Sequence, residues 1–293
     1  MTGKAILHML APGPLASPFD INMALDAGFD AVIPHVNVAL LDVTALVQDA
    51  MFSRPPHYAP RTGVFIGGKD ALLALDMLEA ARATLLAPFE ISLFADPAGS
   101  FTTAAAMVAS AQACLNTSLK GLAVTIFGAT GVVGFTAAVL AGLEGASVTL
   151  AGHDGAGRVT ARADAMQARF GVVAQGVDAS TEASKRAILA TTDVALCAGP
   201  AGMNILSTAM LAASPGLRLV ADVNAVPPAG IEGLGLQDKG TPVGSTRIMG
   251  LGPLAIGNVK YKTESALFAR MSSASRAVYL DFRDAYATAR TFV

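Results

Sequence analysis

The stretch Lys120–Gly134, KGLAVTIFGATGVVG, predicts a buried strand followed by a glycine-rich turn and a helix. Gly128, Gly131 and Gly134 have the spacing G-x-x-G-x-x-G, close to the commoner G-x-G-x-x-G of dinucleotide-binding proteins. In such sites the first glycine permits the tight turn, the second admits a pyrophosphate, and the third lets helix and strand pack closely. The helix N-terminus then attracts the anion. We therefore expect a Rossmann-type NAD(P) domain, with a purely structural glycine turn as the alternative.

The residues before this turn form a separate series of alternating strands and helices. The expected strands are 4–9, 31–34, 61–66 and 90–94, and the expected helices are 18–28, 42–51, 71–83 and 101–115. Such alternation favours a mainly parallel sheet. Because the fingerprint opens a domain of its own, this first α/β domain should hold the substrate.

A polar segment at 116–121 marks the break, and a second series of strands and helices begins after it. Its expected strands are 122–127, 147–150, 172–175, 193–197 and 218–223, and its helices are 132–143, 158–169, 181–190 and 203–212. Residues 226–257 are rich in glycine and proline and predict loops, and 263–290 predict one broken helix or two. The fold class is therefore α/β with two domains.

Composition narrows the function classes. The chain has 293 residues, of which 14% are charged and 53% hydrophobic, which is typical of a compact protein. A net charge of −2 gives no electrostatic footprint for nucleic acid or for an anionic membrane. The longest apolar run, 132–143, is too short to cross a bilayer. We expect a cytoplasmic protein with a small-molecule ligand and with Cys114 and Cys197 as reduced, buried thiols.

The end of the second strand of a Rossmann domain indicates which dinucleotide binds. An acidic residue there contacts the ribose 2′-hydroxyl, and a basic residue contacts a 2′-phosphate. The sequence at 150–158 is LAGHDGAGR, with His153 at the expected position, Asp154 one place later and Arg158 at the start of the next helix. This mixed set favours use of both NAD and NADP. Alternatively, Asp154 and Arg158 only face solvent.

The motifs for several common chemistries are missing. The four histidines are scattered, so we expect no metal site, and neither G-x-S-x-G nor a Walker lysine is present. Four other segments carry candidate polar residues: FIGGKD at 65–70, ADPAGSFTTAAA at 95–106, ADVNAVPPAG at 221–230 and GNVKYKTE at 257–264. The first three follow apolar strands, and ligands of open α/β sheets bind beyond the carboxyl ends of strands.

Each candidate also has a structural interpretation. Side chains at 96–103 either cap the following helix or also bind a substrate. Asn224 and its neighbour Asp222 are placed to orient a nicotinamide carboxamide. In an extended segment, alternation would put Lys260 and Lys262 on one face, either as solvated lysines or with one of them at the substrate.

These four segments stand in a fixed order around GATGVVG, and the chain also contains SPFDI at 17, HVNV at 35 and CAGPAG at 197. Together they resemble the sequence of the methylotroph-type methylene-tetrahydromethanopterin dehydrogenases. That family is related to the methylene-tetrahydrofolate dehydrogenases. The resemblance covers nearly the whole chain. It implies a pterin-binding domain of residues 1–115 plus helices returning at 264–293, a Rossmann domain at 116–263, and NAD(P)-dependent oxidation of a methylene bridge to a methenyl group.

The resemblance also implies roles for individual residues. Lys260 matches a lysine of the pterin site and is the candidate catalytic residue. The positions that match the substrate side are Asp20, Asp96, Ser100, Thr102 and Thr103. The positions expected on the cofactor side are Gly128, Thr130, Gly131, Val133, Gly134, His153, Arg158, Ala198, Gly199 and Asn224. Strictly NADP-dependent relatives have an arginine–lysine pair where this chain has His153 and Asp154. The resemblance therefore implies relaxed or NAD-leaning use, as in the branch of the family that takes both dinucleotides.

Three alternatives stay open from the sequence. One is a methylene-tetrahydrofolate dehydrogenase. Another is a shikimate-dehydrogenase-like enzyme, for which Lys69 is the evident catalytic lysine in the first domain. The third is a non-catalytic NADP sensor. A low-charge, alanine-rich surface also favours a homo-oligomer.

Overall fold

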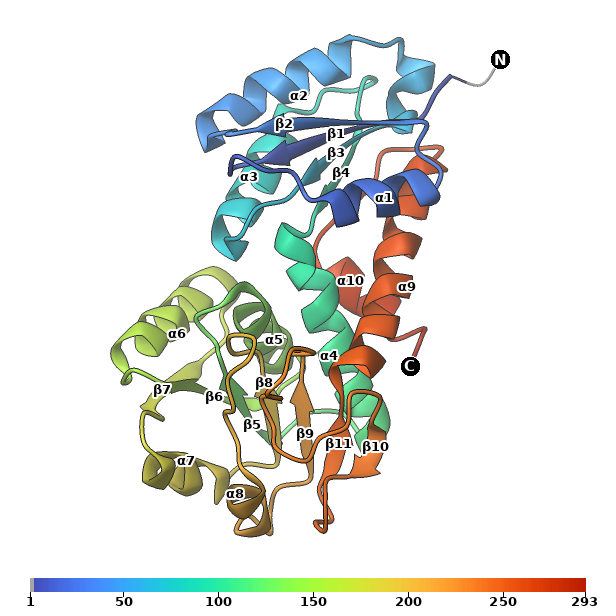
Figure 1. Cartoon of the computed structure of the whole chain (residues 1–293). Helices are drawn as coiled ribbons and strands as arrows, with labels where there is room; N and C mark the ends of the chain where they lie inside the picture. Colours follow the sequence, from blue (N-terminus) through green and yellow to red (C-terminus); the bar gives the residue numbers. More distant parts are fainter. Residues whose placement is uncertain (1–2) are drawn as a thin grey trace. The chain divides into compact units, whose positions relative to one another are not determined.

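A computed structural model describes residues 3–293. The chain forms two compact units (Figure 1). The first unit contains the chain up to Thr102, then Tyr261–Thr288 and Phe292, and the second contains Thr103–Lys260, Ala289–Thr291 and Val293. The division therefore falls inside a helix, whereas the sequence placed it after residue 115. The two-domain α/β class is confirmed, because each unit has its own mainly parallel sheet.

The first unit is built on a five-stranded sheet in the order β12-β4-β3-β1-β2, in which every neighbouring pair is parallel. The strands are β1 (Ile6–Ala11), β2 (Ala31–Val36), β3 (Thr62–Ile66), β4 (Ser92–Ala95) and β12 (Tyr279–Leu280). The helices of this unit are α1 (Pro18–Asp26), α2 (Val43–Phe52), α3 (Ala71–Thr84) and α10 (Phe282–Ala289). The returning segment thus adds an edge strand as well as a helix.

An aromatic cluster fills the core of the first unit. Phe65 of β3, Phe94 of β4 and Phe268 are all fully buried, and their ring centroids lie 5.2–5.4 Å apart. Phe29 meets the ring of Phe268 edge to face at 6.4 Å. Phe268 belongs to α9 (Pro253–Ser272), so the C-terminal half of α9 is anchored in this core.

The second unit has a seven-stranded sheet in the order β10-β11-β9-β8-β5-β6-β7. Its strands are β5 (Ala123–Phe127), β6 (Ser147–Gly152), β7 (Ala174–Asp178), β8 (Val194–Cys197), β9 (Leu219–Asp222), β10 (Lys239–Pro242) and β11 (Met249–Leu251). Its helices are α5 (Val132–Leu143), α6 (Gly157–Phe170), α7 (Glu182–Leu189) and α8 (Thr208–Ala212). Only the β10–β11 pair is antiparallel. The five-strand order β7-β6-β5-β8-β9 is the 3-2-1-4-5 order of a Rossmann sheet.

Two long helices have residues in both units, and one of them begins earlier than the sequence indicated. α4 (Ser100–Leu115) begins in the first unit and ends in the second. α9 begins at Pro253, ten residues before the expected start, because proline fits the first turn of a helix and Gly257 does not interrupt it. The loop-rich segment expected at 226–257 therefore also contains β10, β11 and the start of α9, which the sequence did not indicate.

Candidate functional site

The glycine-rich turn follows β5 directly and leads into α5. Gly128 has φ +86°, a left-handed conformation, and a Cβ there would overlap the carbonyl group of Ala198. A Cβ at Gly134 would overlap the carbonyl oxygen of Gly128 itself. Both glycines are therefore required by close approaches of the backbone.

Gly131 closes this turn, because its N–H donates to the carbonyl oxygen of Gly128 at 3.0 Å. It stands at the N-cap of α5, where glycine offers no side chain to the N–H groups of the first helical turn. Gly131 is exposed. Helix N-termini of this kind bind phosphate, so the turn fits the pyrophosphate of a dinucleotide.

Strand register brings further predicted cofactor residues to the same edge of the sheet. Phe127 of β5 is aligned with Cys197 of β8, and Cys197 is aligned with Asp222 of β9. Ala198 and Gly199 directly follow β8. The loops after β5, β8 and β9 therefore begin side by side, where a Rossmann sheet binds its ligand.

The loop after β9 is held by two of its own side chains. Asp222, which is buried, accepts hydrogen bonds from the N–H groups of Asn224 at 3.1 Å and Gly230 at 2.9 Å. Asn224 Oδ1 accepts from the N–H of Val226 at 2.9 Å, and its Nδ2 donates to the carbonyl of Pro228 at 3.4 Å. Burial raises the pKa of Asp222 despite these donors. Both side chains thus shape the loop, a role that the sequence analysis did not assign.

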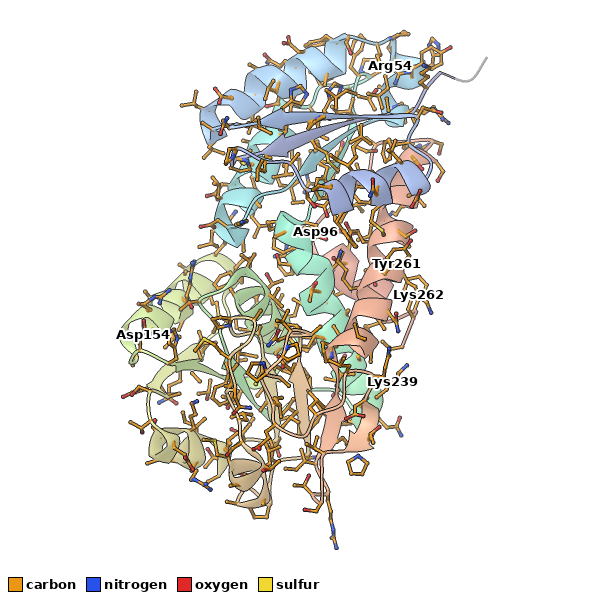
Figure 2. All side chains as sticks on the ribbon, viewed as in Figure 1. Arg54, Asp96, Asp154, Lys239, Tyr261 and Lys262 are labelled. Carbon is orange, nitrogen blue, oxygen red and sulfur yellow. The ribbon has the colours of Figure 1, made fainter. Side chains whose placement is uncertain are left out.

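The connection between β6 and α6 carries an ion pair. Arg158 Nη1 lies 3.0 Å from Asp154 Oδ2, and His153 Nδ1 lies 3.9 Å from Asp154 Oδ1. The hydrogen bond from Arg158 is the main cause that lowers the pKa of Asp154. Figure 2 marks Asp154 on the ribbon of the second unit, and the side chains of Asp154 and Arg158 are 41% and 62% exposed. These two residues therefore interact with each other as well as with solvent.

The segment after β4 is a buried helix cap. Asp96 Oδ1 accepts from the N–H of Phe101 at 2.7 Å, and Asp96 Oδ2 accepts from Thr102 Oγ1 at 2.6 Å. Asp96, Ser100 and Thr102 are at most 1% exposed. Ser100 Oγ has no hydrogen-bond partner among the described residues. The capping role that the sequence left open for Asp96 and Thr102 is therefore present, and Thr103, which is half-buried, follows on the same helix.

Asp20 and Lys260 lie on different helices. Asp20 is in the first turn of α1 and is buried, and its N–H donates to Ser17 Oγ at 3.2 Å. Lys260 is on α9 and half-buried, whereas Lys262 is exposed. The prediction of an extended segment with both lysines on one face is wrong, because residues two apart on an α-helix differ by about 200° in direction.

Two of the four histidines, which are scattered in the sequence, are neighbours in the structure. His8 of β1 and His35 of β2 have ring nitrogens 3.1 Å apart. Burial, and then the nearby His35, lower the pKa of His8. The sequence alone did not indicate this proximity, because it depends on the register of β1 and β2, in which His8 is aligned with Ile33 and His35 with Leu10. Cys114 is also only half-buried, whereas Cys197 is buried as expected.

The residues that the structure describes, 3–293, also bear on metal binding and on membrane insertion. Within this range no three side chains of histidine, cysteine, aspartate or glutamate are grouped so as to hold a metal ion. None of the helices described there is long and apolar enough to span a membrane.

Comparison with known proteins now adds to this geometry. Residues 18–98 match the family model of the methylene-tetrahydromethanopterin dehydrogenase N-terminal domain. An NAD(P)-dependent methylenetetrahydromethanopterin dehydrogenase of Methylorubrum extorquens is 49% identical over 97% of both chains. The chain belongs to the methylene-tetrahydromethanopterin dehydrogenase family. The bifunctional protein MdtA of the same organism is 31% identical over 98% of both chains.

Solved structures agree on the fold of this family member. Shikimate 5-dehydrogenase of Listeria monocytogenes, in complex with shikimate and NAD, has a TM-score of 0.55 at 15% identity, covering 92% of each chain. Quinate dehydrogenase of Corynebacterium glutamicum, in complex with NAD, also has a TM-score of 0.55, at 16% identity over 97% of this chain and 98% of that one. At such identities the similarity shows a shared α/β fold.

Proposed function

We propose that the chain oxidises 5,10-methylene-tetrahydromethanopterin to the 5,10-methenyl form with NADP or NAD, as a step of formaldehyde oxidation in one-carbon metabolism. The observation that carries this proposal is the 49% identity over 97% of the chain to a dehydrogenase named for that reaction. The glycine-rich turn supports it, since its uncapped helix N-terminus and close backbone approaches fit a dinucleotide pyrophosphate.

The reaction requires no general acid or base from the protein at the reacting carbon. The methylene carbon lies between two nitrogens, so loss of a hydride leaves a cation shared over N–C–N, and no proton has to move at that carbon. When bound, the nicotinamide ring supplies the hydride acceptor. The protein mainly has to hold the two reacting carbons at about 3–3.5 Å and exclude water that would hydrolyse the product. A site without a histidine–carboxylate pair is sufficient for this.

On the cofactor side, we propose that Gly128, Thr130, Gly131, Val133 and Gly134 surround the pyrophosphate. Ala198, Gly199 and the loop held by Asn224 would form the nicotinamide side, because they follow β8 and β9 at the same edge. Asp222 positions this loop through its backbone hydrogen bonds. His153 and Arg158 are assigned to the adenosine ribose.

On the substrate side, Asp20, Asp96, Ser100, Thr102 and Thr103 stay the proposed residues. Asp96 and Thr102 act by fixing the start of α4, because their polar atoms bond to each other and to that backbone. Ser100 offers a hydroxyl group whose hydrogen-bond capacity no described residue uses.

We assign Lys260 to positioning of the pterin. A protonated amine beside the developing cation would oppose hydride loss by Coulomb repulsion, so we do not assign it an electrostatic role at that carbon. Lys260→Ala should raise the KM for the pterin at least tenfold, which corresponds to about 1.4 kcal/mol. Lys262→Ala is the matched control, since Lys262 lies on the same helix but is exposed. Unchanged kcat and KM in Lys260→Ala would contradict the assignment.

The direct test is an activity assay. The protein is mixed with NAD or NADP and methylene-tetrahydromethanopterin, then with methylene-tetrahydrofolate, and absorbance of the reduced nicotinamide is followed. We expect turnover with the methanopterin substrate. Turnover with the folate alone would establish the folate alternative, and turnover with neither would refute the proposal.

A homo-oligomer in the cytoplasm also remains part of the proposal. In the first unit Phe52 and Leu86 are more than half exposed, and the ring of Phe52 lies 5.5 Å from that of Phe89. An apolar group of this kind favours self-association. Light scattering coupled to gel filtration measures the mass, and a mass near 29.6 kDa would refute the oligomer.

A further inference from the structure

The turn that follows β6 presents a carboxylate and a guanidinium at one place. β6 ends at Gly152, and a Cβ at Gly152 would overlap the carbonyl oxygen of Gly155, so the backbone reverses sharply over 153–155. Asp154 lies on this turn, and Arg158 reaches it from the first turn of α6 at 3.0 Å. A Cβ at Gly155 or Gly157 would have no neighbour within 4 Å, so the space beside the pair is open.

In a Rossmann domain this is the place of the adenosine ribose. The 2′-hydroxyl of NAD can donate a hydrogen bond to a carboxylate without disturbing a neighbouring arginine. The 2′-phosphate of NADP carries nearly two negative charges at neutral pH, so it attracts Arg158 and is repelled by Asp154. To bind the phosphate, Arg158 has to leave the carboxylate, which is then left facing the phosphate.

We propose that Asp154 is the residue that determines the preference between NAD and NADP, and that its ion pair with Arg158 lets one site accept both. NAD binds with the pair closed. NADP binds when Arg158 turns from Asp154 to the phosphate. The free energy of NADP binding is then reduced by the loss of the ion pair and by the repulsion between Asp154 and the phosphate. This inference rests on the proposed NAD(P) site and adds to it the residue that ranks the two cofactors.

Neighbouring charges do not take over this role. Asp178, at the end of β7, is in register with Gly152, but its Oδ1 accepts from the N–H of Ser180 within its own turn. The imidazole of His153 is 65% exposed and stands 3.9 Å from Asp154, beyond hydrogen-bond distance. Among the charged side chains that the structure describes around this turn, Arg158 makes the short contact with Asp154.

The test is the ratio of the dissociation constants for NADP and NAD, measured by calorimetry without pterin. In Asp154→Asn the ratio should fall about tenfold, because one unit of repulsion on a doubly charged phosphate is removed at an exposed site. In Arg158→Gln the ratio should rise by a similar factor. The Arg158→Gln effect on NADP should be larger in the Asp154→Asn background, where the guanidinium is no longer shared.

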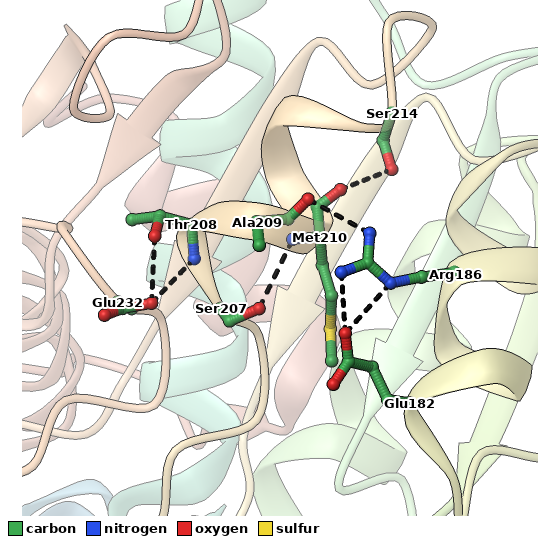
Figure 3. A network of polar contacts seen from close by, with 8 residues as sticks. All are labelled: Glu182, Arg186, Ser207, Thr208, Ala209, Met210, Ser214 and Glu232. Atoms are coloured by element: carbon green, nitrogen blue, oxygen red, sulfur yellow. Dashed lines mark hydrogen bonds and ion pairs between the residues drawn. The ribbon is translucent and has the colours of Figure 1, made fainter.

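The chain offers a matched control pair. Glu182 and Arg186 of α7 form an exposed ion pair with the same spacing of four residues, with Arg186 Nη2 2.6 Å from Glu182 Oε1 (Figure 3). Glu182→Gln makes the same change in net charge and should leave the ratio unchanged. A ratio unchanged in Asp154→Asn, or shifted equally in Glu182→Gln, would overturn the proposal.

Failure of this inference can be distinguished from failure of the proposed reaction. If both dinucleotides bind and the ratio shifts as expected while no pterin is oxidised, the selectivity role of Asp154 stands and the proposed reaction fails. If the unmodified protein binds neither dinucleotide, the cofactor assignment and this inference both fail.

Discussion

Replacement of Asp96 by alanine tests whether the segment after β4 is held mainly by a buried cap. The change removes the acceptor of the Phe101 N–H at 2.7 Å, of Thr102 Oγ1 at 2.6 Å and of the Thr102 N–H at 3.3 Å. Asp96 is fully buried, so water cannot replace it. A buried polar group left without a partner costs about 1–3 kcal/mol.

The expected loss follows from these contacts. The Phe101 N–H loses its short bond to the carboxylate, while Thr102 Oγ1 keeps a weaker acceptor, the carbonyl of Gly99 at 3.2 Å. About 3 kcal/mol of unfolding free energy should therefore be lost. For a chain of 293 residues, whose unfolding entropy is about 2.1 cal/mol/K per residue, that loss corresponds to a Tm lower by roughly 5 °C. Calorimetry or circular dichroism on heating measures it.

Asp70→Ala is the matched control for Asp96→Ala. Asp70 caps α3 in the same way, accepting from the N–H groups of Leu72 at 2.9 Å and Leu73 at 3.0 Å, but it is exposed. Water can replace it there, so the cost should be about 1 kcal/mol. If Asp96→Ala loses no more than Asp70→Ala, the argument from burial is refuted.

Further predictions concern the glycine turn and the histidine pair. Gly128→Ala should lower the unfolding free energy by about 2 kcal/mol or more and abolish NAD binding in calorimetry, because φ is +86° and the carbonyl group of Ala198 occupies the place of the new Cβ. Gly216→Ala is the control and should do neither, since a Cβ at Gly216 meets open space. For His8, whose pKa is lowered on folding, the unfolded chain binds more protons below about pH 6.5, so stability should fall as pH falls below that value. Urea unfolding at pH 7.5 and 5.5 measures this loss of stability. The loss should be smaller in His8→Gln, which lacks the titrating ring next to His35, and an equal loss in both proteins would contradict the argument.

Local pattern was sufficient for most of the fold. The helix expected over 132–143 occupies those residues, since an apolar run bounded by glycine turns leaves few alternatives. The strands before and after it were placed within two or three residues.

The elements that were missed depend on partners distant in the sequence. β12 has two residues and is a strand only because it pairs with β4. β11 lies in a glycine-rich segment and pairs with β9, about thirty residues earlier, and β10 is added beside β11. The helical position of Lys260 was missed because the alternation of GNVKYKTE fits a strand as well as a helix turn. In the structure this segment continues into the turns of α9 that carry Phe268, whose ring packs in the aromatic core.

Within the candidate site, the residues were easier to predict than their contacts. The glycines of the turn could be predicted because the tight turn and the close backbone contacts require glycine at a fixed spacing in the sequence. Asp96 and Asp222 were recognised as polar residues after strands, but their distance from solvent depends on the whole unit. The neighbouring His8 and His35 needed the register of two strands, which a single sequence does not display.

The two ends of the proposed dinucleotide site differ in their freedom to change. At Gly128 and Gly134 the backbone itself occupies the space that a side chain would need, so any other residue there would clash with backbone atoms. A side chain at Gly157 would meet open space, and Asp154 and Arg158 project into solvent. On the proposed assignment, single substitutions over 153–158 would change which dinucleotide binds, while the pyrophosphate turn would stay the same.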